Sequence, residues 1–317
     1  MKIKSWFNFF TVIALLSLLG GFFAPLRAQT SDQNFPQVSD YASLQAKILQ
    51  GWNTWDNRSI MTHVLLPEAL AIHLQILDTL RGDSLTLAFT GNQVAGSEKV
   101  RTLAHTPNGS YTDFVMTWRN FGLRIQSAAN GENIYLLVTP TDSLPNPGYL
   151  MVKSTFMYSK PGEVHLESGK WVARAPSKTY TIRSLGREGR TTGHTLLEPF
   201  TGLIGLSNDP EASLRSVQAI IQAREVAYQQ RKTSFGDLAE VYNALQNVLN
   251  WHVVYDPAQH RAVTPVARPW SYGWGNRQPG GYILFAGTTS LLPTCTAWKA
   301  RNWPSTKPFR CAGKLMN

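Results

Sequence analysis

The sequence predicts an α+β fold in which an antiparallel β-sandwich precedes a helical domain. Between about residue 65 and residue 200, short segments rich in Leu, Ile, Val, Tyr and Thr are separated by Gly, Pro, Asn and Asp. Regular turn signals of this kind are typical of an antiparallel sandwich. After residue 208 the apolar residues recur at helical spacing instead. Because strands come first and helices follow, we expect a β domain joined to an α domain near residues 200–210.

The strands are assigned from alternating side chains and from the turn residues that bound them. In the segment from Asp113 to Arg119, the residues Phe114, Met116 and Trp118 alternate with neighbours that face the other way. The same reading along the chain gives six strands, which are Ser84–Thr90, Thr112–Trp118, Gly122–Ser127, Asn133–Thr139, Tyr149–Phe156 and Thr179–Ser184.

Two helices are expected after the strands, and a short one before them over residues 41–50. The first long helix opens at residues 208–211, with Asp209 as its N-cap and Pro210 in its first turn. Its apolar face contains Leu214, Val217, Ile220, Ile221 and Val226. The second begins at Ser234 and ends at Asp256, before a proline. Its apolar face contains Leu238, Val241, Leu245, Val248 and Leu249.

The first 28 residues have the pattern of a secretory signal peptide. Lys2 and Lys4 precede an apolar run, and Ala28 is the small residue after which a signal peptidase would cut. We therefore expect an exported protein, periplasmic or secreted, with no stable membrane insertion after cleavage. The alternative is an uncleaved anchor, because the apolar run approaches the ~20 residues that span a bilayer.

The formal net charge of +10 is unevenly distributed along the 317 residues. Residues 1–28 carry three of the positive charges and residues 286–317 carry five, with no acids in either segment, so residues 29–285 carry only +2. A binding site for nucleic acid is therefore not expected. Both cysteines, Cys295 and Cys311, lie after residue 285. The body of an exported protein would then depend on packing and not on disulfides.

Two aromatic segments suggest a binding site for sugars, which offer flat apolar faces and rings of hydroxyl groups. The first contains Trp52, Asn53, Trp55, Asp56 and Arg58. The second, rich in glycine, contains Trp270, Tyr272, Trp274, Asn276 and Arg277. The alternative for the first segment is a structural aromatic cluster tied by a contact between Asp56 and Arg58, and composition does not separate the two interpretations.

Other kinds of site find little support in the sequence. No nucleophile elbow, zinc-protease motif, P-loop or dinucleotide fingerprint is present, and the seven histidines have no ligand spacing. Asp237 and Glu240 could be paired acids, but first-turn charges that favour a helix dipole are the preferred interpretation. We therefore predict no metal and no cofactor.

Six stretches are similar in sequence to the motifs of one known family: Gln50–Glu68, Ser234–Gln246, Trp251, Tyr255–Pro257, Pro265–Arg268 and Gly280–Phe285. They resemble bacterial members of glycoside hydrolase family 63, the mannosyl-oligosaccharide glucosidase and mannosylglycerate hydrolase group, over most of residues 45–285. The resemblance implies a β-sandwich followed by an (α/α)6 barrel, in which two carboxylates act as general acid and general base and invert the anomeric centre. Such a pair stands ~6.5–9.5 Å apart, to admit the attacking water.

The chain departs from this family directly after Phe285. The family continues there with a Trp-Asp pair whose Asp is the general acid, whereas this chain continues with Ala286-Gly287-Thr288-Thr289. Reading from the third base of the Ala286 codon permits Trp-Asp-Asn. Because charge and cysteine content change at the same boundary, we interpret residues 286–317 as an out-of-frame tail.

The expected organisation is therefore a signal peptide (1–28), a β-sandwich domain (29–205), the start of an (α/α)6 barrel (206–285) and the tail (286–317). The expected function is that of the N-terminal portion of an exported hydrolase of α-linked glucosides or mannosides. We expect this chain to be inactive, because its catalytic carboxylates are missing. The alternatives are a non-catalytic glycan-binding sandwich and an unstable fragment.

Overall fold

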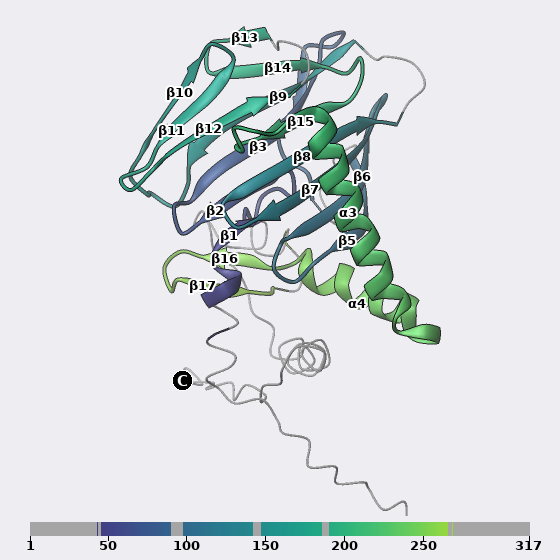
Figure 1. Ribbon diagram of the computed structural model, residues 1–317. Coiled ribbons are helices and arrows are strands. Elements are labelled where there is room, and N and C mark those ends of the chain that lie inside the picture. Colours follow the sequence, from purple (N-terminus) through teal and green to yellow (C-terminus); the bar gives the residue numbers. More distant parts are fainter. Residues whose placement is uncertain are drawn as a thin grey trace, which may run out of the picture.

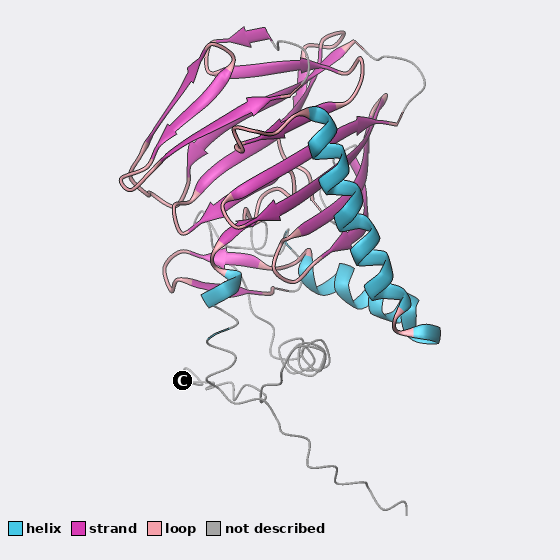
Figure 2. Cartoon of the chain, viewed as in Figure 1, coloured by secondary structure: helices cyan, strands magenta, loops and turns pink. Residues whose placement is uncertain are grey.

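A computed structural model describes residues 43, 46–89, 98–141, 147–185, 190–265 and 268. In this part of the chain, two antiparallel sheets pack face to face and a long helix crosses the outer face of one of them (Figures 1 and 2). The α+β class and the antiparallel character of the sheets are confirmed. The expected signal peptide and the tail at residues 286–317 lie outside the described residues.

Sheet A has the strand order β1-β2-β3-β9-β14-β13, with β4 also paired to β3. Its strands are β1 (Gly51–Asn53), β2 (Thr62–Leu66), β3 (Leu70–Asp78), β4 (Asp83–Leu85), β9 (Gly148–Phe156), β13 (Arg190–Thr192) and β14 (Thr195–Pro199). Sheet B has the order β10-β11-β12-β15-β8-β7-β6-β5. Its strands are β5 (Glu98–His105), β6 (Tyr111–Trp118), β7 (Phe121–Asn130), β8 (Asn133–Pro140), β10 (Glu163–Glu167), β11 (Lys170–Arg174), β12 (Thr179–Ser184) and β15 (Ile204–Ser207).

The main core lies between the two sheets. The alternating residues that predicted β6, Phe114 and Met116, are buried there with Leu74 and Val152 of sheet A. Five of the six predicted strands correspond closely to β6, β7, β8, β9 and β12. The expected strand Ser84–Thr90 is wrong at residues 86–89, because the backbone of Ala88 forms hydrogen bonds with Ser59 and Ile60 and not with β3.

Helix α3 (Leu214–Thr233) packs across the outer face of sheet B (Figure 1). The predicted N-cap was wrong: Ser213 caps the helix, and its side chain forms a capping box with Ser216. Asp209 instead accepts hydrogen bonds from the Glu211 N–H and from the Tyr135 hydroxyl, at 3.0 and 2.7 Å. These bonds hold residues 209–212 in a turn, so the helix begins about one turn later than expected.

Helix α4 (Ala239–Asn250) follows a short 3-10 helix, η2 (Gly236–Leu238). Ser234 does not open this helix, since it is the C-cap of α3, and α4 ends before the predicted stop at Asp256. The expected apolar face is largely turned outward: Leu238, Val241 and Val248 are 50%, 49% and 57% exposed.

Polar contacts account for this orientation of α4. Asn250 donates to the carbonyl of His105 at the end of β5, and Asn247 donates to the carbonyl of Leu103 at 3.2 Å. Gln246 is buried beside them and accepts from Asn250 at 3.0 Å. Because these amides satisfy groups at the sheet edge, they fix which side of the helix faces the sandwich.

A hairpin of β16 (Val254–Asp256) and β17 (Arg261–Val263) follows α4. Its residues Tyr255 and Ala262, with Val253, cover a small apolar cluster on β2 and β3 that includes Val64 and Ala71. The helices of the described residues close no barrel, and they pack on the sandwich. The expected (α/α)6 barrel stays a prediction.

Candidate functional site

The first candidate segment begins at β1 and lies mostly inside the protein. Trp52 is 2% exposed, belongs to the main core, and donates its Nε1–H to the carbonyl of Glu132 at 2.6 Å. Asn53 is buried, and its side chain accepts the backbone N–H of Thr54 at 2.7 Å. Both side chains therefore already have structural partners.

Trp55 lies in the second apolar cluster, beneath the β16–β17 hairpin. It is 1% exposed and meets the ring of Tyr255 edge-on, with 6.5 Å between ring centroids. Its carbonyl accepts a hydrogen bond from the hydroxyl of Tyr158 at 3.3 Å. The ring of Tyr158 also packs against the ring of Tyr255, with 5.1 Å between ring centroids. The indole Nε1 of Trp55 is buried and has no hydrogen-bond partner among the described residues.

Asp56 and Arg58 form a local pair. The buried Asp56 carboxylate accepts the backbone N–H of Arg58 at 2.9 Å and its Nε at 3.2 Å, while the Arg58 side chain remains 44% exposed. This is the contact that the structural alternative expects. The roles of Trp52, Asn53, Trp55, Asp56 and Arg58 in binding a sugar stay predictions.

Arg268 holds this segment in place. It is fully buried, and its guanidinium donates to the carbonyls of Thr54 and Asp56 on one side. On the other side it donates to the carbonyls of Trp251 and Val253, at 2.6 and 3.2 Å. One side chain thus joins the 54–59 loop to the segment that leaves α4.

Burial strongly affects the ionisable groups around Arg268. Loss of solvent lowers the pKa of Arg268 to about 10, an effect that the nearby Asp56 carboxylate partly opposes. Burial and, second, the charge of Arg268 lower the pKa of His63 to about 3. His252 is affected by the same two causes, which lower its pKa to about 4. Both histidines are therefore neutral at pH 7, beside one buried cation.

The second candidate segment is not covered by the structure. Trp270, Trp274 and Arg277 lie outside the described residues, so their proximity to Trp52 and Trp55 stays a prediction. Trp270 follows Arg268 by two positions in the sequence.

The acidic residues singled out on the second helix have ordinary helical roles. Asp237 lies in the first turn of η2 and Glu240 in the first turn of α4. Glu240 also pairs with Lys232 of α3 at 2.6 Å. These contacts agree with the preferred interpretation as first-turn charges.

A partly buried polar network between sheet B and α3 was not foreseen. Arg124 donates to both oxygens of Asp113, at 3.0 and 2.7 Å, and to Glu225 at 2.7 Å. Gln126 donates to the Tyr111 hydroxyl at 3.0 Å. Because Arg124 pairs with Asp113 and Glu225 together, this network ties α3 to the sheet.

In the described ranges, no group of three or more His, Cys, Asp and Glu side chains could hold a metal ion. No helix in the same ranges combines the length and the apolar character needed to cross a membrane. No family model matches the chain, and no curated protein matches it. The relation to glycoside hydrolase family 63 therefore stays a prediction from the resemblance of its motifs.

Proposed function

We propose that this chain is the N-terminal portion of an exported glycoside hydrolase of the family 63 type. Its substrate would be an α-linked glucoside or mannoside, hydrolysed with inversion by a general acid and a general base. The low charge of residues 29–285 gives no reason to propose a nucleic acid as a partner.

The convergence of the family-like segments on Arg268 carries this proposal. The resemblance was based on separate stretches, and three of them contain Thr54, Trp251 and Arg268. In the fold Arg268 joins these stretches through buried hydrogen bonds, to Trp251 at 17 positions away and to Thr54 at 214 positions away. A chance likeness of short motifs gives no reason for them to meet.

The outward face of α4 also supports the proposal. Val241 and Val248 of α4, with Leu238 of η2 just before it, present apolar side chains to solvent, and a helix in a larger helical domain buries such residues against neighbouring helices. The sandwich with α3 and α4 would then be the base on which a barrel is built.

We propose that the chain alone does not hydrolyse glycosides. The resemblance places the general acid directly after the Gly280–Phe285 motif, where the sequence has no Asp or Glu. The buried acids of the described part of the chain are Asp56, Asp78, Asp113 and Asp256, each paired with an arginine, and Glu98 and Glu198, which form no ion pair with a described residue.

Two measurements test the proposal. The nucleotide sequence across the codons for Phe285 and Ala286 should encode Trp-Asp in the shifted frame, and its absence would contradict the frame change. The purified chain, incubated with α-glucosides and with mannosylglycerate, should release no product. Product above background would contradict the proposed inactivity.

A second candidate function is glycan binding without catalysis. It is favoured by the buried Nε1–H of Trp55, which has no partner among the described residues, since a substrate oxygen could accept this N–H after a local opening. Calorimetry of this chain with α-linked oligosaccharides separates the two candidates. Only the second candidate requires that the chain as it stands binds the oligosaccharide without hydrolysing it.

A further inference from the structure

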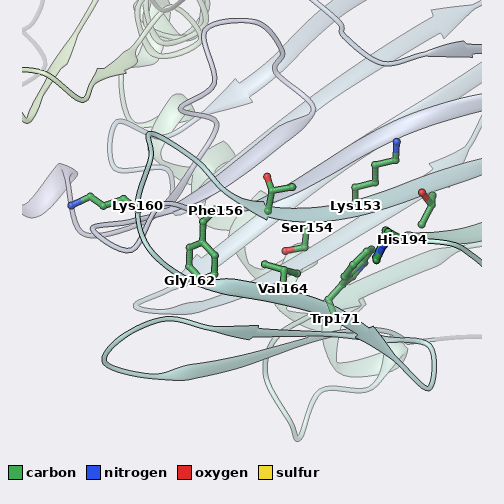
Figure 3. Close-up of a pocket in the computed structure, with 10 residues that line it drawn as sticks. Lys153, Ser154, Phe156, Lys160, Gly162, Val164, Trp171 and His194 are labelled. Atoms are coloured by element: carbon green, nitrogen blue, oxygen red, sulfur yellow. The ribbon is translucent and has the colours of Figure 1, made fainter.

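The outer face of sheet A has a polar row that the proposed function leaves unexplained. His73 of β3 and Lys153 of β9 are cross-strand partners, so their Cβ atoms lie about 5 Å apart on one face of the sheet. Thr155 follows Lys153 by two positions and faces the same side. Figure 3 shows Lys153 extending from β9 on the side opposite to Ser154 and Trp171. Because Thr155 is exposed and Lys153 half-buried, the row reaches solvent outside the sandwich.

The His73 ring lies between two threonine hydroxyls. Its Nδ1 is 3.1 Å from Oγ1 of Thr62, and its Nε2 is 2.9 Å from Oγ1 of Thr155. Burial lowers the pKa of His73 below 6.5, so the ring is neutral at pH 7 and one of its nitrogens carries the single proton. With this proton on Nε2, the ring donates to Thr155, and the Thr155 hydroxyl proton points outward. With the proton on Nδ1, Thr155 donates to the ring instead.

Two cations lie beside this ring. After burial and the opposing charge of Asp56, the charges of Arg58 and Lys153 are the next causes that shift the pKa of His73, and both lower it. Because Coulombic interactions weaken with distance, both side chains lie near the ring. The two cations therefore come from separate segments, the 54–59 loop and β9, and meet on the outer face of sheet A.

Both cations have donors to offer. Arg58 binds the Asp56 carboxylate through its backbone N–H and its Nε, at 2.9 and 3.2 Å, and its two terminal nitrogens have no hydrogen-bond partner among the described residues. Lys153 forms no ion pair with a described residue. Asp56 is buried, whereas the Arg58 side chain is 44% exposed. The surface that solvent meets here is therefore positive.

We infer that Arg58, Lys153 and Thr155 bind a phosphate group, either free or as the monoester of a small molecule. The guanidinium fork and the ammonium supply charge-assisted hydrogen bonds, and the Thr155 hydroxyl donates to a third oxygen. A phosphate has an oxygen for each of these three groups, whereas a carboxylate has only two. His73 is a positioning residue: a bound phosphate selects the tautomer with the proton on Nε2, since that tautomer turns the Thr155 O–H outward. The inference goes beyond the proposed hydrolase, because it requires no catalytic carboxylate.

NMR of the full chain with 15N-labelled histidines tests both parts of the inference, with inorganic phosphate as the probe. The His73 signals are assigned by their absence in His73→Gln. Phosphate should bind with a Kd of about 1 mM, and binding should weaken as NaCl is raised from about 0.05 to about 0.5 M. At saturating phosphate the His73 proton should be on Nε2. A Kd above about 10 mM, or a proton on Nδ1 at saturation, overturns the inference.

Two further probes identify the source of the phosphate group. Glucose 6-phosphate should bind as well as inorganic phosphate does, or more tightly, because both carry the same oxyanion. Binding at least about tenfold tighter assigns the site to a sugar ester, and equal binding assigns it to the free anion. Glucose, which has no charge, should not bind at the same concentrations. Equal binding of glucose would contradict a phosphate site.

Variants locate the site. Lys153→Gln and Arg58→Gln should each weaken phosphate binding about tenfold, with urea unfolding as the check that Arg58→Gln remains folded. Thr155→Val, at an exposed position, should weaken binding without changing the unfolding midpoint by much, and Thr155→Ser, which keeps the hydroxyl, should retain binding. Lys99→Gln, at an exposed lysine on β5, should not change it. If Lys153→Gln behaves like Lys99→Gln, phosphate binds elsewhere and the assignment is wrong.

Discussion

Removing the Arg268 guanidinium should destabilise the fold more than any exposed arginine does. In Arg268→Met, the carbonyls of Thr54, Asp56, Trp251 and Val253 lose their donor while they remain buried. An unpaired buried carbonyl costs about 1–3 kcal/mol, so four of them give a loss of about 4–12 kcal/mol.

Removing the buried charge of Arg268 has the opposite effect and stabilises the variant. Since the pKa of Arg268 falls from 12.5 to about 10, keeping it charged inside costs about 3 kcal/mol, and the variant regains that amount. We expect a net loss near 4 kcal/mol, in line with removing one partner from a buried charged network. Arg268→Lys keeps the charge but not the fork of donors, so its loss should be smaller, about 2 kcal/mol.

Urea unfolding followed by tryptophan fluorescence measures the difference, because Trp52, Trp55 and Trp251 are all buried near this site. Arg174→Met is the matched control: Arg174 is about half exposed and paired with Glu167 on the surface, so it should cost under about 1 kcal/mol. If Arg268→Met cost no more than this control, Arg268 would not anchor the 54–59 loop.

Three further predictions follow from the same contacts. His63 has a pKa of about 3 in the fold and 6.5 when exposed. Between these pH values the unfolded chain binds one more proton, on this histidine, than the folded chain does. The free energy of unfolding therefore falls by about 1.4 kcal/mol per pH unit as pH drops from 6.5 towards 3. Urea unfolding at several pH values should reveal this slope in the parent and in His165→Leu, an exposed control, but a flatter one in His63→Leu. Gly162→Ala should lose about 1–3 kcal/mol on urea unfolding, because its methyl group meets Phe156, whereas Gly202→Ala, where a Cβ meets nothing, should lose little. We also expect the exposed Val241 and Val248 to promote self-association. Val241→Lys with Val248→Lys should therefore reduce self-association in sedimentation while changing stability by under about 0.5 kcal/mol, since both side chains are already exposed.

Each of these three predictions would be contradicted by a specific result. An unchanged pH slope in His63→Leu would mean that other groups govern acid unfolding. Equal losses at Gly162 and Gly202 would mean that the Phe156 ring does not exclude a side chain at Gly162. Unaltered self-association of the double lysine variant would mean that the outward face of α4 is not what drives association.

The sandwich was predictable where one side of a strand faces the core and the other faces water. Phe114 and Met116 alternate with neighbours in sequence, and β6 is found there. β2 was missed because all five of its residues are buried, with His63 among them, so no alternation appears. β10 was also missed, although Val164 and Leu166 alternate with polar residues in its sequence, as expected of a strand at a sheet edge.

The site was less predictable than the fold. The aromatic segment at Trp52 and Trp55 was recognised, but its burial depends on β16–β17 and on Arg268, far along the chain. Arg268 was noted only within a family-like stretch. Its partners are mainly backbone carbonyls, which every residue has, so no pattern of residue types could reveal them. The orientation of α4 was likewise decided by Asn250 and Gln246, which a count of apolar residues ignores.

We propose that this chain belongs to an inverting glycoside hydrolase whose catalytic acid follows Phe285 in another frame. The direct measurement is proton NMR of an α-glucoside or mannosylglycerate incubated with the product of the frame-corrected gene, beside this chain as the control. The corrected protein should release a sugar that first appears as the β anomer, and this chain should release none. Hydrolysis by this chain, no hydrolysis by the corrected protein, or first release of the α anomer would contradict the account.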